Sequence, residues 1–150
     1  QWVFHDAGTY PLYRMVNGQL LYQRSGWVDE ARGRLAALPE HFWQVIMDST
    51  RLAVAYHLND LRAAVFREDP LFTVFSLSQF LRSLCGFLFA ANRAFEPSAR
   101  LLGEKVRSLS RLPDGFAGRF ESLLRDDPLL PPQRKCEIAE LLAKSILPMA

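Results

Sequence analysis

The chain has 150 residues, of which 49% are hydrophobic and 23% are charged, the ordinary mix of a globular protein the size of one domain. This composition excludes a disordered or collagen-like chain. The formal net charge is only +2 and the arginines are scattered, so neither a nucleic-acid-binding face nor a face for an anionic membrane is indicated.

Residues 1–26 favour β structure. Pro11–Val16 and Gln19–Gln23 are short runs of strand-favouring residues, and Asn17-Gly18 between them is a strong hairpin signal because both turn positions need positive φ. Trp2–Phe4 is typical of the end of another strand. A lone hairpin is only marginally stable in water. We therefore interpret residues 1–26 as the remnant of a preceding sheet domain, and expect the chain to be the C-terminal part of a larger protein.

Residues 27–150 show the apolar spacing of helices, interrupted by prolines. The spacing predicts helices over 28–38, 39–67 (one long helix, or two with a break near Asp48), 71–95, 97–107, 116–125 and 133–147. Asp69 is the expected N-cap before Pro70. The segment 71–95 is apolar around most of its circumference, which predicts a central position. The predicted fold class is all-α, an antiparallel bundle of about five or six helices after a short β-hairpin.

The two cysteines, Cys85 and Cys136, lie in apolar helical patterns far apart in the sequence, so we expect reduced, buried thiols. The longest uninterrupted apolar stretches are far shorter than the ~20 residues that span a bilayer, and no signal peptide is recognised. A cytoplasmic location without a membrane segment is therefore expected.

No metal site is predicted, because His5, His41 and His57 lack the partner spacing of a zinc site. G-x-S-x-G, Walker and G-x-G-x-x-G motifs are absent. Arg51 and His57 do match the R-x4-6-H spacing of the helical HEPN ribonucleases. Six residues along a helix is about 600° of rotation, so these two side chains point in different directions. The ribonuclease hypothesis therefore ranks third, well behind the two hypotheses given below.

Two polar groups interrupt the helical pattern. Asn92 and Arg93 follow an apolar run, and a buried amide needs partners, so Asn92 either completes a structural hydrogen-bond network or faces a cleft. Arg67, Glu68 and Asp69 form either a cap with a solvated turn or, if Asp69 and Asn92 lie on adjacent helices, part of one polar mouth.

Several segments together resemble a known superfamily: "LLYQRSG", "LAALPEHFW", "AVFREDPLF", "LCGFLFAANRAFEP" and "LSRLPDGFAGRFESLL". In this order, over roughly residues 20–126, they are similar to the helical C-terminal region of nucleotidyltransferase-like proteins, the superfamily of kanamycin-type aminoglycoside nucleotidyltransferases. The resemblance implies a preceding domain whose Gly-Ser turn and Asp-x-Asp pair hold Mg²⁺ and a nucleotide triphosphate. Neither motif occurs in this chain.

Carried over position by position, the resemblance makes Arg67, Asp69, Asn92, Arg93 and Arg100 the candidate nucleotide- or substrate-binding residues. Glu68 replaces the glycine of a turn that more often reads arginine-glycine-aspartate, and Arg100 stands where lysine is more usual. The leading hypothesis is a helical domain that contacts the nucleotide or the small-molecule or protein acceptor of such an enzyme. The chain alone is not expected to be catalytic.

The competing hypothesis is a non-catalytic helical module that binds a protein partner, including a second copy of itself. An exposed apolar strip on the last helix would favour it; the candidate members are Ile138, Leu141, Leu142 and Ile146.

Overall fold

The computed structural model of the chain describes residues 8–127 and 129–149, and within them all regular structure is helical. The elements are α2 (Tyr10–Asn17), α3 (Trp27–Ala36), α4 (Glu40–Phe66), α5 (Pro70–Ala91), α6 (Ala99–Arg107), α7 (Phe116–Leu124), α8 (Pro132–Ser145) and the 3₁₀ turn η1 (Leu147–Met149). The predicted all-α class is confirmed, and the helices after Trp27 lie close to their predicted bounds.

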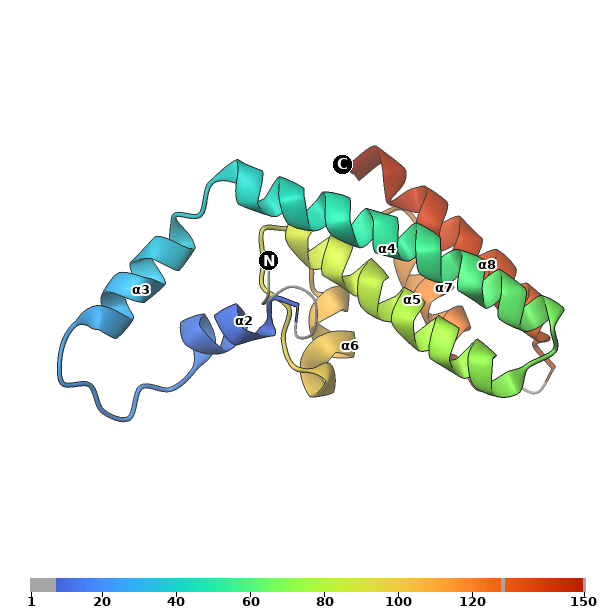
Figure 1. Cartoon of the computed structure of the whole chain (residues 1–150), viewed down its shortest axis with the longest axis horizontal. Coiled ribbons are helices and arrows are strands. Elements are labelled where there is room, and N and C mark those ends of the chain that lie inside the picture. Colours follow the sequence, from blue (N-terminus) through green and yellow to red (C-terminus); the bar gives the residue numbers. More distant parts are fainter. Residues whose placement is uncertain (1–7, 128, 150) are drawn as a thin grey trace.

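The centre of the fold is an antiparallel pair formed by α4 and α5 (Figure 1). The helix α8 packs along α4, and α7 packs against α8. Phe80, Phe87 and Leu88 of α5 are completely buried, and the last eight residues of α5, 84–91, are all buried. The predicted central position of this helix is therefore confirmed. Each large apolar side chain buried in this way stabilises the fold by about 1.5–3 kcal/mol.

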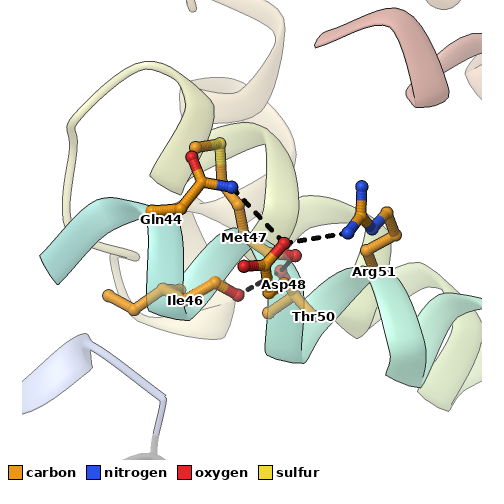
Figure 2. Close-up of polar contacts among 6 residues, drawn as sticks. All are labelled: Gln44, Ile46, Met47, Asp48, Thr50 and Arg51. Carbon is orange, nitrogen blue, oxygen red and sulfur yellow. Dashed lines mark hydrogen bonds and ion pairs between the residues drawn. The ribbon is translucent and has the colours of Figure 1, made fainter. Parts of the chain in front are cut away.

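The helix α4 continues without a break through the segment near Asp48. Thr50 donates its hydroxyl hydrogen to the carbonyl oxygen of Ile46 at 2.7 Å, so the hydroxyl is satisfied inside the helix (Figure 2). In the turn between α4 and α5, the carboxylate of Asp69 accepts the backbone N–H of Phe72 at 3.0 Å, and Pro70 is the first residue of α5. The predicted N-cap is confirmed.

The β-hairpin prediction is wrong, because Pro11–Val16 lies inside the helix α2. Leu12, Met15 and Val16 also fit helical spacing, and Pro11 supplies the fixed φ that favours a helix start. Gly18 ends the helix with an extended backbone (φ −66°) instead of the positive φ of a hairpin turn. Residues 19–23 have no regular structure, and Trp2–Phe4 lies outside the described residues. The β remnant assigned to residues 1–26 therefore has no support from this segment.

The helices α2 and α3 lie beside the main bundle instead of inside it (Figure 1). They contact each other, and Arg32 of α3 donates to the carbonyl oxygens of Met15 (3.0 Å) and Gly18 (2.6 Å) at the end of α2. The compact bundle consists of α4, α5, α7 and α8, with α6 against α5. The predicted antiparallel bundle of about five or six helices is therefore not confirmed.

Candidate functional site

The five residues expected to contact a ligand do not form one site. Arg67 and Asp69 flank the turn between α4 and α5, whereas Asn92 and Arg93 follow the opposite end of α5 (Figure 1). The 22 residues of α5 separate these ends by about 33 Å at the usual helical rise. Arg100 lies on α6, with an exposed side chain. Asp69 and Asn92 therefore cannot line one polar mouth.

The charged turn between α4 and α5 is a helix-ending motif. The backbone N–H of Glu68 donates to the carbonyl of Val65 (3.2 Å), and that of Asp69 donates to the carbonyl of Ala64 (3.1 Å). Glu68 has a φ of 55°. These features define a Schellman motif, in which glycine is the preferred left-handed residue. The arginine-glycine-aspartate turn of the nucleotidyltransferase-like proteins has glycine at the position of Glu68, and glycine suits this left-handed backbone conformation.

Asn92 stabilises the other end of α5. Its amide nitrogen donates to the carbonyls of Leu88 and Arg111, each at 2.8 Å. Its amide oxygen accepts the backbone N–H of Arg111 at 2.8 Å and the hydroxyl of Ser110 at 3.2 Å. Three of these bonds connect the end of α5 to Ser110 and Arg111 before α7, and the fourth stays within α5; together they use the full capacity of a primary amide. Asn92 was expected either to complete a structural hydrogen-bond network or to face a cleft, and the observed bonds form such a network.

Arg93 ends α5 and borders a pocket. Like Glu68, it has a left-handed backbone (φ 51°), and the following N–H, of Ala94, donates to the carbonyl of Phe89 at 2.9 Å. Arg93 lines a pocket of about 640 Å³, here called the Arg93 pocket. Residues of α2, α3, α4, α5 and α6 line it. Five helices thus meet around one of the predicted site residues.

The Arg93 pocket combines positive charge with an aromatic wall. Arg32, Arg93 and Lys105 supply the charge, and Trp43 and Phe95 pack with ring centroids 5.2 Å apart. Acidic neighbours reduce the net charge only in part, since Arg93 pairs with Glu40, and Lys105 lies 3.4 Å from Glu104. Such a lining attracts an anionic group and offers an aromatic surface to a flat or apolar one.

A small polar cluster fixes the start of α2, which forms one wall of this pocket. The carboxylate of Glu96 accepts hydrogen bonds from the backbone N–H (3.0 Å) and the hydroxyl (3.2 Å) of Thr9. In return, the hydroxyl oxygen of Thr9 accepts the backbone N–H of Glu96 at 2.7 Å. Gly8 has a φ of +56°, and a Cβ there would overlap the Glu96 carboxylate. We call this cluster the Thr9–Glu96 clamp. Thr9 and Glu96 are 87 residues apart in sequence, so no local sequence pattern indicates this cluster.

The remaining chemistry-bearing side chains are not assembled into a site. Among the described residues, no group of three His, Cys, Asp or Glu side chains is placed to hold a metal ion. Arg51 is bonded to Asp48 at 2.9 Å, as Figure 2 shows, whereas His57 lies 3.9 Å from Asp60. Each half of the ribonuclease-like pair thus has its own acidic neighbour on α4.

Both cysteines are free and buried, as predicted. Burial, reinforced by the charge of Glu96, raises the pKa of the Cys85 thiol to about 12. Burial also raises the pKa of Cys136, with a further contribution from Glu140. Thiols with raised pKa values are poor nucleophiles at neutral pH. They act here as small apolar groups.

Two surface features bear on partners. The helix α5 is long and apolar enough to cross a membrane by length and composition alone, but more than half of its most apolar window is buried against the other helices. The last helix α8 exposes no apolar strip, because Leu142 and Ile146 are buried, Ile138 is partly buried, and Leu141 alone of the four candidates is exposed.

The comparisons with known proteins identify a family. No curated protein and no solved structure matches the chain. A family model described as a domain of unknown function, DUF4037, matches residues 5–100, which include α2 to α5 and most of the lining of the Arg93 pocket. Because the match covers well over half of the 150 residues, the chain belongs to the DUF4037 family.

Proposed function

We propose that the chain is a helical, ligand-contacting domain of a nucleotidyltransferase-like protein, and that the Arg93 pocket contacts its nucleotide or its acceptor. The metal-binding catalytic motif, with its Mg²⁺ and nucleotide triphosphate, would lie outside this chain. The observation that carries the proposal is the gathering of Arg32, Arg93 and Lys105 around an aromatic wall. Cationic side chains beside aromatic rings suit a ligand with a phosphate and a base.

The geometry narrows the set of residues in the proposal. Arg93 is the candidate contact residue, and Asn92 positions it by fixing the end of α5. Arg67 and Asp69 lie at the far end of α5, and Arg100 is outside the pocket lining. Asp69 has a local structural role instead, because its carboxylate caps the start of α5.

The test is calorimetric titration of the protein with ATP in the presence of Mg²⁺. Replacing Arg93→Gln removes one charge from the pocket, and we expect about tenfold weaker binding, the effect of losing one charge-assisted hydrogen bond. Arg100→Gln is the matched control, because it removes the same charge from an exposed site outside the pocket lining. Equal affinities of the two variants, or no ATP binding by the unchanged protein, would refute a role of the pocket in nucleotide binding.

A second candidate function, protein interaction, is supported by another surface. The strip expected on α8 is not exposed, but four large apolar side chains are exposed on α4: Val45, Leu52, Tyr56 and Phe66.

A preceding nucleotidyltransferase-type domain as the partner of this chain, and a cytoplasmic location, stay predictions.

A further inference from the structure

The helix α4 has two apolar faces. One packs into the core and carries Met47, Val54 and Leu61, each seven residues from the next and no more than 6% exposed. The other face carries Val45, Leu52, Tyr56 and Phe66, which are 49%, 72%, 64% and 89% exposed. A helix at the edge of a bundle normally has a polar outer face. The outer face of α4 therefore has a surface typical of an interface.

The spacing on this outer face is that of a coiled-coil seam. Val45, Leu52, Asn59 and Phe66 recur every seven residues, and Ser49, Tyr56 and Ala63 fall four residues after the first three of them. This alternation of four and three residues is the a/d pattern of a heptad repeat, with the second set at a and the first at d. The buried row Met47, Val54 and Leu61 then occupies the f positions, directly opposite the seam. We call the outer row the α4 seam.

We propose that the α4 seam packs antiparallel against the α4 seam of a second copy of this chain, about a twofold axis near residue 54. In that register, Tyr56 of each copy meets Leu52 of the other, and Ala63 meets Val45. The polar members are also matched, because Ser49 meets Asn59. The seam is thus complementary to itself, as a twofold interface requires.

The charges flanking the seam favour the antiparallel orientation. Asp48 and Arg62 both occupy g positions, and antiparallel packing places Asp48 of each copy opposite Arg62 of the other. A parallel pair would instead bring Arg62 of one copy against Arg67 of the other, a like-charge contact. The side chains of Asp48 and Arg62 are 48% and 47% exposed, so both can be reached.

Existing contacts of these two side chains are compatible with the pairing. Asp48 accepts bonds from Gln44 (3.4 Å) and Arg51 (2.9 Å), both to the same oxygen, as Figure 2 shows. Arg62 donates through two of its nitrogens, to Glu140 (2.8 Å) and Asn59 (3.0 Å). Among the described residues, the second carboxylate oxygen of Asp48 and the third guanidinium nitrogen of Arg62 make no such bond, and they supply an acceptor and donors.

The size of the seam sets the expected strength. The 27 residues of α4 span about 40 Å, and a strip about 10 Å wide covers roughly 400 Å² on each copy. Stable interfaces bury about 800 Å² on each partner, so this interface is a small one. Ala53 and Ala55 flank the proposed axis, where small side chains allow the two helices to approach closely. We expect a reversible dimer with a Kd on the order of 10 μM.

Sedimentation equilibrium of the protein at about 1 to about 200 μM tests the dimer. We expect monomer at the low end and mostly dimer at the high end. Leu52→Glu should weaken dimerisation at least tenfold, because it places a charge in the centre of the seam. Leu129→Glu is the control, since Leu129 is 90% exposed and lies outside α4. Circular dichroism should show both variants folded, as both positions are exposed.

The charge pair tests the orientation. Asp48→Arg and Arg62→Asp should each weaken the dimer, and the double variant should recover most of the lost affinity. A monomer at every concentration, or equal effects of Leu52→Glu and Leu129→Glu, would overturn the interface. Failure of the double variant to recover would overturn the antiparallel register. None of these outcomes depends on the Arg93 pocket.

Discussion

Replacing Glu68 by glycine should stabilise the protein, because Glu68 holds the left-handed position that ends α4. Its φ is 55°, and the left-handed region costs a residue with a Cβ about 1–2 kcal/mol. No side-chain hydrogen bond or ion pair involving Glu68 offsets this cost among the interactions described. Glycine avoids the strain but orders a more flexible chain on folding, which costs about 0.4–1 kcal/mol. The expected gain is therefore about 0.5–1 kcal/mol in the free energy of unfolding.

Thermal unfolding followed by circular dichroism measures this gain. For a chain of this length, a change of about 1 kcal/mol moves Tm by about 2–4 °C, so Glu68→Gly should raise Tm by about 1–4 °C. Arg67→Gly is the matched control, because Arg67 has an ordinary helical backbone (φ −81°) and gains nothing from glycine. It should lower Tm. A lower Tm for Glu68→Gly, or equal shifts for the two variants, would refute the assignment of strain to Glu68.

Four further results are expected. Asn92→Ala should lower the free energy of unfolding by about 2–4 kcal/mol in urea titrations, because several hydrogen bonds at the end of α5 are lost together; a neutral effect would contradict its structural role. Gly8→Ala should cost about 1–3 kcal/mol by the same assay, since it combines a positive φ with overlap of Glu96. The hydrogen bond from Arg62 lowers the pKa of Glu140, so this pair stabilises the fold above the unfolded-state pKa of the carboxyl group, and the contribution is lost as pH falls through the lower folded pKa. Comparing the Arg62→Gln variant with the unchanged protein at neutral and acidic pH should therefore show a deficit of less than about 1 kcal/mol at neutral pH that disappears in acid. With its pKa raised to about 12, Cys85 should react with a thiol reagent at pH 8 only as fast as the protein unfolds, which kinetic labelling can check.

Much of the helical layout could be predicted because its signals are local. Apolar spacing and the prolines gave the helices from Trp27 onward, and Asp69-Pro70 gave a helix start. The N-terminal segment was misassigned because its β-favouring composition and the Asn17-Gly18 turn signal outweighed the helical i, i+3, i+4 spacing of Leu12, Met15 and Val16. The backbone does not make the positive-φ turn that Asn17-Gly18 favours.

The candidate site could be predicted only in part. The pattern correctly singled out Asn92 as an amide that needs partners, but two of its partners, Ser110 and Arg111, are 18 and 19 residues away. The Arg93 pocket is lined from five helices, so its existence depends on packing that no local spacing encodes. The residues matched by resemblance were found at helix ends, where backbone geometry already restricts the choice of side chain.

The attachment of α2 and α3 has a consequence for how the pocket would respond to a ligand. The helix α2 buries no residue of its own and α3 buries only Val28, so the Thr9–Glu96 clamp is a main connection between this wall and the bundle. Elements with little buried surface open at a lower free energy than the whole fold, and amide hydrogen exchange detects such opening. A ligand that binds only the closed wall has its apparent affinity reduced by the fraction of molecules that are closed. The stability of the Thr9–Glu96 clamp would then determine part of the affinity of the Arg93 pocket for its ligand, although neither Thr9 nor Glu96 needs to contact that ligand.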